Sequence, residues 1–324
     1  MRVVRVREFG PPAVLRVEEE AEARPGPGQV LVRAELAGVI YGETVVRSGQ
    51  YPLPLPWIPG TEVGGRVEAV GAGADEELLG RRVVATTLGN VGGYAEYALA
   101  KTGNVLPVPD GLAMHSAVAV FQAGAISIGI LEAVGFLPGE TVLVTAAAGR
   151  IGSLLVQLAK TVGAKTVIGA VGSAAKLAAA GDFGADVAVD YSESDWTARV
   201  QEATGGRGAD VVLDAVGGSV GRQALNAAAY GTGRIGIYGF ASGSPTSFDA
   251  MKITRRGLSV MGALGKTFAK PAADRRAYAE EALASAAAGR LVPRIHGVFP
   301  FERAPDAHTE LDERRNIGAV LLRP

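Results

Sequence analysis

Two patterns of apolar and polar residues divide the chain near residue 112. In the first hundred residues, short segments with alternating apolar and polar positions are separated by glycine and proline. These segments are VRVRE, QVLVRAELAGV, GGRVEAVGAG, RRVVATT and YAEYALA. A period of two predicts half-buried strands. We therefore expect a compact, mostly antiparallel β domain at this end.

From residue 140 to about residue 239, apolar runs alternate with segments of helical spacing. Strands are expected in TVLVTA, KTVIGAV, ADVAVDY, ADVVLDAV and GRIGIYGF, and helices over 153–164, 173–185, 194–203 and 222–229. Ser173 is the expected N-cap of the second helix. Strands that are apolar on both faces and joined by helices predict a doubly wound parallel sheet with right-handed crossovers. A further strand over 258–265, a helix over 272–289 and a strand–helix–strand tail follow.

Composition narrows the chemistry. The chain has 324 residues, which suggests two domains, and a net charge of −1, which gives no general attraction to nucleic acid or membranes. It has no cysteine, so disulfides, thiolate nucleophiles and cysteine-ligated metals are excluded. The most apolar stretch is Leu112–Leu137, and its part with a single strongly polar side chain, Ser116–Leu131, is shorter than the roughly 20 residues of a membrane-spanning helix. With no export signal, we expect a cytoplasmic protein.

The sharpest motif is AAAGRIG at 146–152, placed between an expected strand and an expected helix. Small residues there let the backbone approach a pyrophosphate, and the helix N-terminus offers N–H groups to it. We expect the cofactor loop to comprise Ala147, Gly149, Arg150, Ile151 and Gly152. A purely structural turn is the alternative, and Arg150 either contacts phosphate or faces solvent.

The end of the next strand distinguishes the two nicotinamide cofactors. An NAD site usually places an acidic residue there to bind the ribose 2′-hydroxyl, but residues 169–173 read GAVGS. Lys176 follows one helical turn later. This favours a 2′-phosphate, hence NADPH, unless Lys176 is simply a solvated lysine.

These motifs, in this order, resemble the zinc-free quinone oxidoreductase branch of the medium-chain dehydrogenase/reductase superfamily. The matching segments span nearly the whole chain: PGPGQVLVRAELAGV, RSGQYP, IPGTEVGGRVEAVG, VGGYAEYALA, AAAGRIGSLLVQLAK and GAVLL. The resemblance implies a β-rich, GroES-like catalytic domain from residues 1–118 and 262–324, and a Rossmann domain over 119–261. It further implies NADPH in a cleft and a homodimer in which the strand at 258–265 pairs across a two-fold axis.

The resemblance also assigns expected site residues. Ser173, Lys176 and Tyr191 match positions that often hold the 2′-phosphate, and the turn Tyr238, Gly239 and Phe240 matches the segment lining the nicotinamide. Two tyrosines are candidate proton donors: Tyr51 matches a tyrosine proposed for this role in related enoyl-thioester reductases, and Tyr41 follows Ile40 in the presumed cleft. A neutral phenol can donate a proton at pH 7. Packing roles for both, with solvent as the donor, are the alternative.

Several positions depart from the family pattern. Zinc-containing members have cysteine and histidine where this chain has Ile40 and Thr61, so we expect no metal, and the remaining Glu62 is either structural or part of a site. Ile40 also replaces a common asparagine, Ala125 a threonine and Ala319 a lysine. We therefore expect a more apolar pocket and a small apolar acceptor. Asp214, which ends a strand, is expected to cap the following turn.

The sequence thus predicts an NADPH-dependent, zinc-independent reductase of a quinone or an α,β-unsaturated carbonyl compound. Two alternatives stay open. One is an enoyl or ketone reductase dedicated to a biosynthetic pathway, which the apolar replacements suggest. The other is a non-catalytic NADPH-binding regulator or RNA-binding protein, which the absence of a basic run disfavours.

Overall fold

Both ends of the chain contribute to one unit, whereas its middle forms another. The computed structural model describes residues 1–324, with unit 1 made of Met1–Gln122 and Leu283–Pro324 and unit 2 of Ala123–Ala282. The sequence places the end of the second unit at residue 261. The unit continues to Ala282, and the helix that follows the last strand, over Ala263–Phe268, contacts the sheet.

Unit 2 is built on a six-stranded parallel sheet. Its order is β10-β9-β8-β11-β12-β13, with β8 Thr141–Thr145, β9 Thr166–Val171, β10 Val187–Asp190, β11 Val211–Asp214, β12 Arg234–Ile237 and β13 Ser259–Gly262. The strand order reverses direction after β10, so β8 and β11 lie at the switch point in the middle of the sheet. The expected doubly wound sheet is confirmed.

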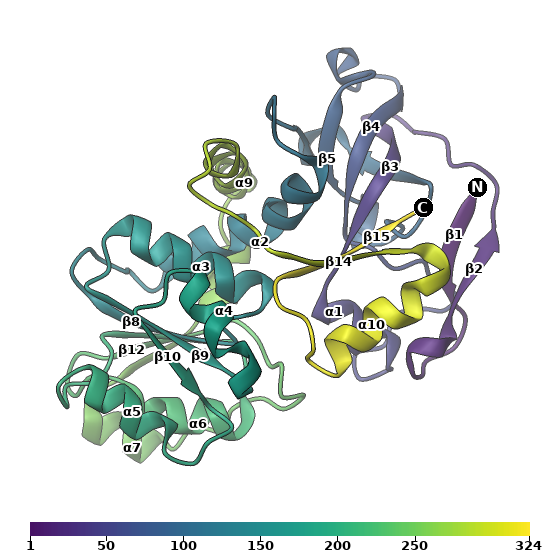
Figure 1. Ribbon diagram of the computed structural model, residues 1–324. Coiled ribbons are helices and arrows are strands. Elements are labelled where there is room, and N and C mark those ends of the chain that lie inside the picture. Colours follow the sequence, from purple (N-terminus) through teal and green to yellow (C-terminus); the bar gives the residue numbers. More distant parts are fainter. The chain divides into compact units, whose positions relative to one another are not determined.

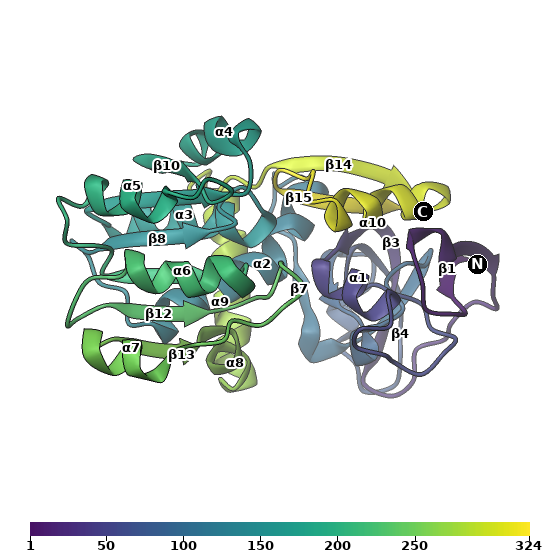
Figure 2. The same ribbon diagram turned by 90° about the horizontal axis from the view of Figure 1, so that it is seen from below.

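Helices cover both faces of this sheet. They are α3 Arg150–Val162, α4 Leu177–Asp182, α5 Trp196–Ala203, α6 Gly218–Ala227, α7 Ala250–Arg256 and α8 Ala263–Phe268, followed by α9 Ala272–Ala287. Figure 1 shows α3 and α4 on one side of the strands and α5, α6 and α7 on the other, and Figure 2 views the second group from below. Right-handed crossovers require this arrangement, because the chain moves outward in opposite directions from β8 and from β11.

Unit 1 is a β structure closed by its C-terminal segment. Its larger sheet has the order β14-β15-β3-β4-β5-β7, with β6 paired to β3. The strands are β3 Gln29–Val39, β4 Glu62–Val70, β5 Arg82–Thr86, β6 Tyr97–Lys101, β7 Val105–Pro107, β14 Ile295–Pro300 and β15 Ala319–Arg323. All pairs are antiparallel except β14–β15, and β15 joins the sheet beside β3. This confirms the expected β-rich domain drawn from both chain ends.

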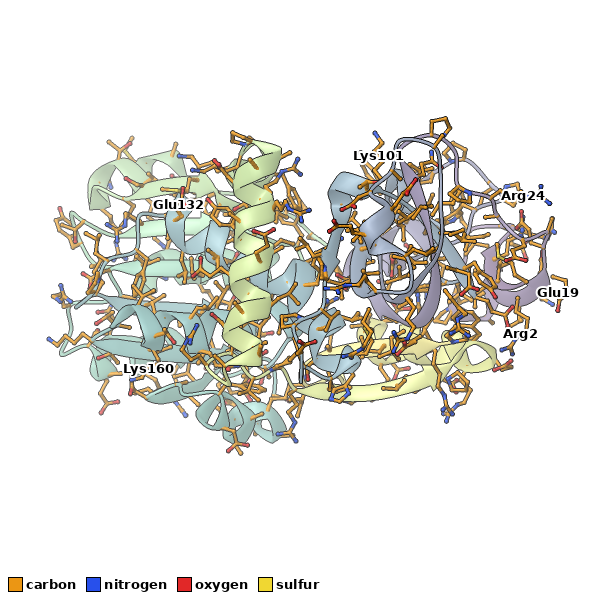
Figure 3. All side chains as sticks on the ribbon, turned by 90° about the horizontal axis from the view of Figure 1, so that it is seen from above. Arg2, Glu19, Arg24, Lys101, Glu132 and Lys160 are labelled. Carbon is orange, nitrogen blue, oxygen red and sulfur yellow. The ribbon has the colours of Figure 1, made fainter.

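A separate two-stranded ribbon and two helices complete unit 1. The ribbon pairs β1 Arg2–Val6 with β2 Leu15–Glu19, and Figure 3 labels Arg2 and Glu19, which lie opposite each other in its register. Helix α1 Tyr41–Arg47 contacts α10 Ala304–Asp312 (Figure 1). The alternation of apolar and polar residues gives no sign of α1, because it is only two turns long.

Other local expectations need adjustment. Ser173 precedes the 3₁₀ turn Ala174–Lys176, but its side chain makes no capping hydrogen bond. The strand expected over 258–265 ends at Gly262, where α8 begins. Helix α2 Met114–Ala133 is long and apolar enough to cross a membrane, yet 67% of its most apolar window is buried inside the protein. A buried core helix has the same composition, so α2 is weak evidence for a membrane span.

Candidate functional site: a glycine loop and two buried carboxylates

The glycine loop of unit 2 leaves β8 and enters α3 in a single tight turn. Ala146 adopts a left-handed φ of 51°, and the amide of Gly149 donates to the Ala146 carbonyl at 2.9 Å. The helix begins after Gly149, and a Cβ on Gly152 would overlap the Ala146 carbonyl oxygen. Since Ser153 donates the first bond within the helix, the N–H groups of the first turn are directed out of its end. This cradle suits a phosphate group.

Thr145, the residue immediately before this loop, is held by residues at the ends of β11 and β12. Its hydroxyl donates to Asp214 Oδ1 at 2.9 Å and accepts from the Ala215 amide at 2.9 Å. Its carbonyl accepts from the Tyr238 hydroxyl at 3.2 Å. Three strand ends are therefore joined at the entrance to the loop, and we call Thr145, Asp214 and Tyr238 the loop clamp.

Asp214 also caps the turn that follows its own strand. Its carboxylate accepts from the amides of Val216 at 3.0 Å and Gly217 at 3.2 Å, which confirms the expected cap. Burial raises the pKa of Asp214, and these hydrogen bonds oppose that effect. Burial likewise raises the pKa of Tyr238, so its hydroxyl stays protonated and remains a donor to Thr145.

The nicotinamide-lining turn expected at 238–240 divides into buried and exposed parts. Tyr238 is buried and belongs to the loop clamp, whereas Phe240 is 50% exposed. Gly239 packs closely, because a Cβ there would lie 2.9 Å from the Ala215 carbonyl oxygen. Within unit 2, Phe240 is thus the residue of this turn with a side chain available to contact a ligand.

The expected 2′-phosphate residues lie at the ends of β9 and β10. The amide of Tyr191 donates to the Val171 carbonyl at 2.8 Å, and a Cβ on Gly172 would lie 2.8 Å from the Tyr191 hydroxyl. The phenol therefore lies against Gly172. Ser173 and Lys176 share one turn, since the Lys176 amide donates to the Ser173 carbonyl at 3.0 Å.

The two candidate proton donors occupy different environments in unit 1. Tyr41 is the first residue of α1 and is half-buried, and burial raises its pKa while the charge of Arg314 lowers it. Arg314 has a left-handed φ of 55°, which is strained for a residue with a side chain. Tyr51, in the loop after α1, is 70% exposed. Tyr41 is therefore the more buried of the two.

A buried carboxylate, which sequence reasoning missed, lies next to Tyr41. Both oxygens of Glu43 accept hydrogen bonds: Oε1 from the amides of Gly60 at 2.9 Å and Thr61 at 3.0 Å, and Oε2 from the amide of Ile40 at 3.1 Å and the Tyr94 hydroxyl at 2.6 Å. Burial raises the pKa of Glu43 to about 7, although the hydrogen bonds from Tyr94, Ile40 and Thr61 oppose the shift. No sequence pattern points to this set of partners.

The network extends from Tyr94 into the C-terminal part of unit 1. The Tyr94 hydroxyl lies 3.1 Å from Nε2 of His308, which is fully buried on α10. Burial and the charge of Arg47 lower the pKa of His308 to about 3, so its ring is neutral at physiological pH. Arg47 is itself buried and pairs with Asp312 at 2.7 Å.

Glu62 is completely buried in β4 and lies against β3. A Cβ on Gly38 would overlap its carboxylate, so the glycine makes room for this side chain. No group of three or more histidine, cysteine, aspartate or glutamate side chains is arranged so that it could hold a metal ion.

Comparison with known proteins identifies the family. Residues 26–110 match the "Alcohol dehydrogenase GroES-like domain" and residues 151–284 match "Zinc-binding dehydrogenase". A quinone oxidoreductase of Pseudomonas aeruginosa is 34% identical over 319 residues, which cover 98% of this chain and 97% of that protein. The chain belongs to the quinone oxidoreductase family of the medium-chain dehydrogenase/reductase superfamily. The resemblance found in the sequence is confirmed.

Other members of the quinone oxidoreductase family extend the comparison. The crystal structure of Escherichia coli quinone oxidoreductase complexed with NADPH is 29% identical and covers all of both chains, with a TM-score of 0.92. A protein of a Burkholderia species named 2-haloacrylate reductase is 32% identical over 95% of this chain and 94% of its own. Members of this family are oxidoreductases, so the expected enzyme class is confirmed.

Proposed function

We propose that this quinone oxidoreductase family member is an NADPH-dependent, zinc-independent reductase that transfers hydride to a quinone or an α,β-unsaturated carbonyl compound. The observation that carries the proposal is the glycine loop, where Gly149 and Gly152 open the first turn of α3 and the loop clamp holds its entrance. The NADPH complex of the E. coli relative supports the choice of cofactor.

The residues of unit 2 fit this cofactor. The first turn of α3 would bind the diphosphate through backbone N–H groups, with Ala147, Gly149, Arg150, Ile151 and Gly152 forming its cradle. Ser173, Lys176 and Tyr191 would bind the 2′-phosphate, since no carboxylate stands at 169–173 to repel it. Phe240 would cover the nicotinamide.

When bound, NADPH supplies the hydride, and the chain's own residues then have two tasks. The first is to hold the acceptor against the cofactor in a dry site, since orientation alone is worth several kcal/mol, about 7 or more when alignment is good. The second is to protonate the resulting enolate or quinol anion. We assign this to Tyr41 in preference to Tyr51, because a half-buried phenol is held in place and a largely exposed one is not. A positioned acid adds roughly 10²–10⁴-fold.

Two features support an acceptor that needs no Lewis acid. Ile40 and Thr61 stand where zinc-containing relatives have ligands, and the chain has no cysteine. A relative named 2-haloacrylate reductase supports an activated carbon–carbon double bond as the reducible group. A dedicated enoyl or ketone reductase of a pathway remains the second candidate, supported by the apolar residues Ile40 and Ala125.

We also infer a homodimer in the cytoplasm. Strand β13 is the edge of the unit 2 sheet and pairs only with β12, so its other side is available for the same strand of a second copy. Multi-angle light scattering should give twice the 33.1 kDa mass of the chain. Localisation of the tagged full chain tests the compartment.

NADPH oxidation with a panel of enones, enoyl thioesters and quinones, with and without a chelator, tests the activity. We expect turnover with at least one activated double bond or quinone and no effect of the chelator. Tyr41→Phe should lower kcat by about 10²-fold, whereas Tyr51→Phe should leave kcat within about two-fold. Binding of NADPH without turnover of any acceptor would instead favour the non-catalytic alternative, and a filter-binding assay would test RNA.

A further inference from the structure

The Glu43 carboxylate joins three backbone segments that are distant in the sequence. It accepts from Ile40 at the start of α1, from Gly60 and Thr61 before β4, and from Tyr94 before β6. Gly60 has a left-handed φ of 105°, and a Cβ there would lie 2.5 Å from Gly93, so the two loops touch through their backbones. Glu43 thus anchors the backbone at Ile40 and at Gly60 and Thr61.

Only an ionised carboxylate satisfies this arrangement fully. Two carboxylate oxygens offer four acceptor sites, and four donors point at them. Bonds of a charged acceptor are roughly twice as strong as neutral ones. A carboxamide of the same shape would turn its NH₂ group toward the amide of Ile40 or toward the amides of Gly60 and Thr61, so glutamine cannot replace Glu43 without losing at least one hydrogen bond from a backbone amide.

The proton on Tyr94 has two self-consistent positions. With Glu43 ionised, the phenol donates to the carboxylate, so His308 must donate from Nε2 to the phenol oxygen. With Glu43 protonated, the carboxyl can donate to Tyr94, which then donates to Nε2 of the other His308 tautomer. Protonation of Glu43 therefore reverses the direction of the hydrogen bonds from Glu43 through Tyr94 to His308. It also weakens the bonds that Glu43 accepts from the amides of Gly60 and Thr61.

Charged and titratable groups surround Glu43 from every packed element. Glu62 of β4 disfavours its ionisation through charge repulsion, and Tyr94 favours it through a hydrogen bond. Arg47 on the same helix lowers the pKa values of Tyr94 and His308, and it is paired with Asp312 of α10. His308 stays neutral, so Glu43 is the member of the network that gains or loses a proton near neutral pH.

We propose that Glu43 is a positioning residue of the reductase site: its ionised carboxylate fixes the backbone from which Tyr41 extends, and turnover requires that ionised form. This inference rests on the proposed function. It differs from a general structural role because it links one buried proton to the rate of turnover. Glu43 acts through the backbone of Ile40 and Thr61 and is not itself the proton donor.

The decisive experiment is the pH dependence of kcat for the wild-type chain and for Glu43→Gln, with NADPH and one accepted enone at saturation. The wild-type kcat should fall as the pH is lowered, with a midpoint near the Glu43 pKa of about 7. In Glu43→Gln this acid limb should be absent and kcat lower by about 10- to 100-fold at pH 8. NADPH affinity, which depends on unit 2, should not change.

Two controls and a second variant complete the design. Glu96→Gln removes a carboxylate that pairs with Arg2 in the same unit and should leave the profile unchanged. Tyr94→Phe removes a hydrogen bond that lowers the Glu43 pKa, so the acid limb should move to higher pH, whereas Tyr97→Phe should not move it. Tyr94→Phe also serves if Glu43→Gln does not fold.

Hydrogen exchange adds a readout that does not depend on turnover. The amides of Gly60 and Thr61 should exchange faster in Glu43→Gln than in the wild type, because they lose their carboxylate acceptor. Normal wild-type turnover with the acid limb retained in Glu43→Gln, or unmoved in Tyr94→Phe, would overturn the positioning role alone. Absence of wild-type turnover with every acceptor would overturn the proposed function, and the positioning role with it.

Discussion

Glu43 in unit 1 and Asp214 in unit 2 are both buried carboxylates beside candidate chemistry, and their hydrogen-bond networks are assembled in different ways. Asp214 in unit 2 takes two of its partners from the turn directly after its own strand and a third, Thr145, from the adjacent strand. Glu43 in unit 1 reaches Tyr94, which is 51 residues away, and through it His308, which is 214 residues from Tyr94. A local cap forms with its strand, whereas the Glu43 network requires the whole unit.

The difference has a chemical consequence. Asp214 supports the glycine loop, which would bind the cofactor through backbone N–H groups. The protonation state of Asp214 therefore need not change during the reaction. Glu43 is enclosed with a second acid, Glu62, and a neutral histidine, and its pKa is raised to about 7. The carboxylate of unit 2 therefore has a purely structural task, which is to hold the loop in place. Unit 1 contains a carboxylate, Glu43, that can change its charge near neutral pH.

The most disruptive change should be Gly152→Ala in the glycine loop. The added methyl group would overlap the Ala146 carbonyl oxygen, and the helix would have to move away from the strand. Overpacking of about 1–3 kcal/mol corresponds to as much as a roughly 100-fold loss of NADPH affinity, measured by calorimetry.

Gly181→Ala is the matched control for that change. Gly181 lies in α4, and a Cβ there would meet no atom within 4 Å. Alanine is favoured over glycine within a helix by roughly 0.5–1 kcal/mol, so this variant should melt slightly higher and bind NADPH normally. Equal loss of binding in both variants would contradict the role of the loop.

Lys176→Glu should reverse the preference for NADPH over NADH. The substitution replaces a charge-assisted hydrogen bond to the 2′-phosphate, worth roughly 1.5–3 kcal/mol, with repulsion. We expect an NADPH Kd raised by about ten-fold or more and an NADH Kd nearly unchanged. An unaltered ratio of the two Kd values would show that Lys176 is a solvated lysine.

A pair of variants on one strand tests the loop clamp. Asp214→Asn should raise the NADPH Kd by about five-fold, because one amide group must face a donor at Thr145 or at the capped turn. Asp210, at the opposite end of the sheet, accepts from the Thr141 amide at 2.8 Å and so also joins β8 to the β11 side. Asp210→Asn should lower stability without changing the Kd. If both variants bind equally well, the clamp does not support the loop.

The last prediction concerns how stability depends on pH. The pKa of Glu43 is raised in the folded chain to about 7 from 4.5, so the folded state holds an extra proton between these values. This extra proton adds on the order of 3 kcal/mol to the free energy of unfolding. The stabilisation is complete below pH 4.5 and is lost as the pH rises through the folded-state pKa of about 7. Melting curves from pH 5 to 7.5 should therefore slope less steeply with pH in Glu43→Gln than in the wild type. Identical slopes would contradict the raised pKa.

The alternation of strands and helices in unit 2 could be predicted because the spacing of apolar residues within each segment indicates its type. The sequence places every strand of the unit 2 sheet within a few residues, and the glycine loop follows from AAAGRIG and its position. The cap made by Asp214 was also predictable, since an aspartate at a strand end has its partners two and three residues later.

The parts that escaped prediction depend on contacts between distant segments. Helix α1 is short, and its buried Glu43 looks like an ordinary helix carboxylate until Gly60, Tyr94 and His308 are brought together. The role of Tyr238 was also hidden: the family pattern directs it toward the nicotinamide, but its hydroxyl holds the Thr145 carbonyl. Hydrogen-bond partners across strands cannot be read from periodicity.

The position of β15 has a consequence for synthesis on the ribosome. Strand β3 pairs with β15, and Tyr94 contacts His308, so unit 1 stays incomplete until β15 emerges. Unit 2 is continuous from Ala123 to Ala282 and can fold earlier. At about 5–20 residues per second, the end of β3 that pairs with β15, Ala37–Val39, stays without that partner for about ten seconds or longer. Chaperones that shield such edges have their chief opportunity in that interval.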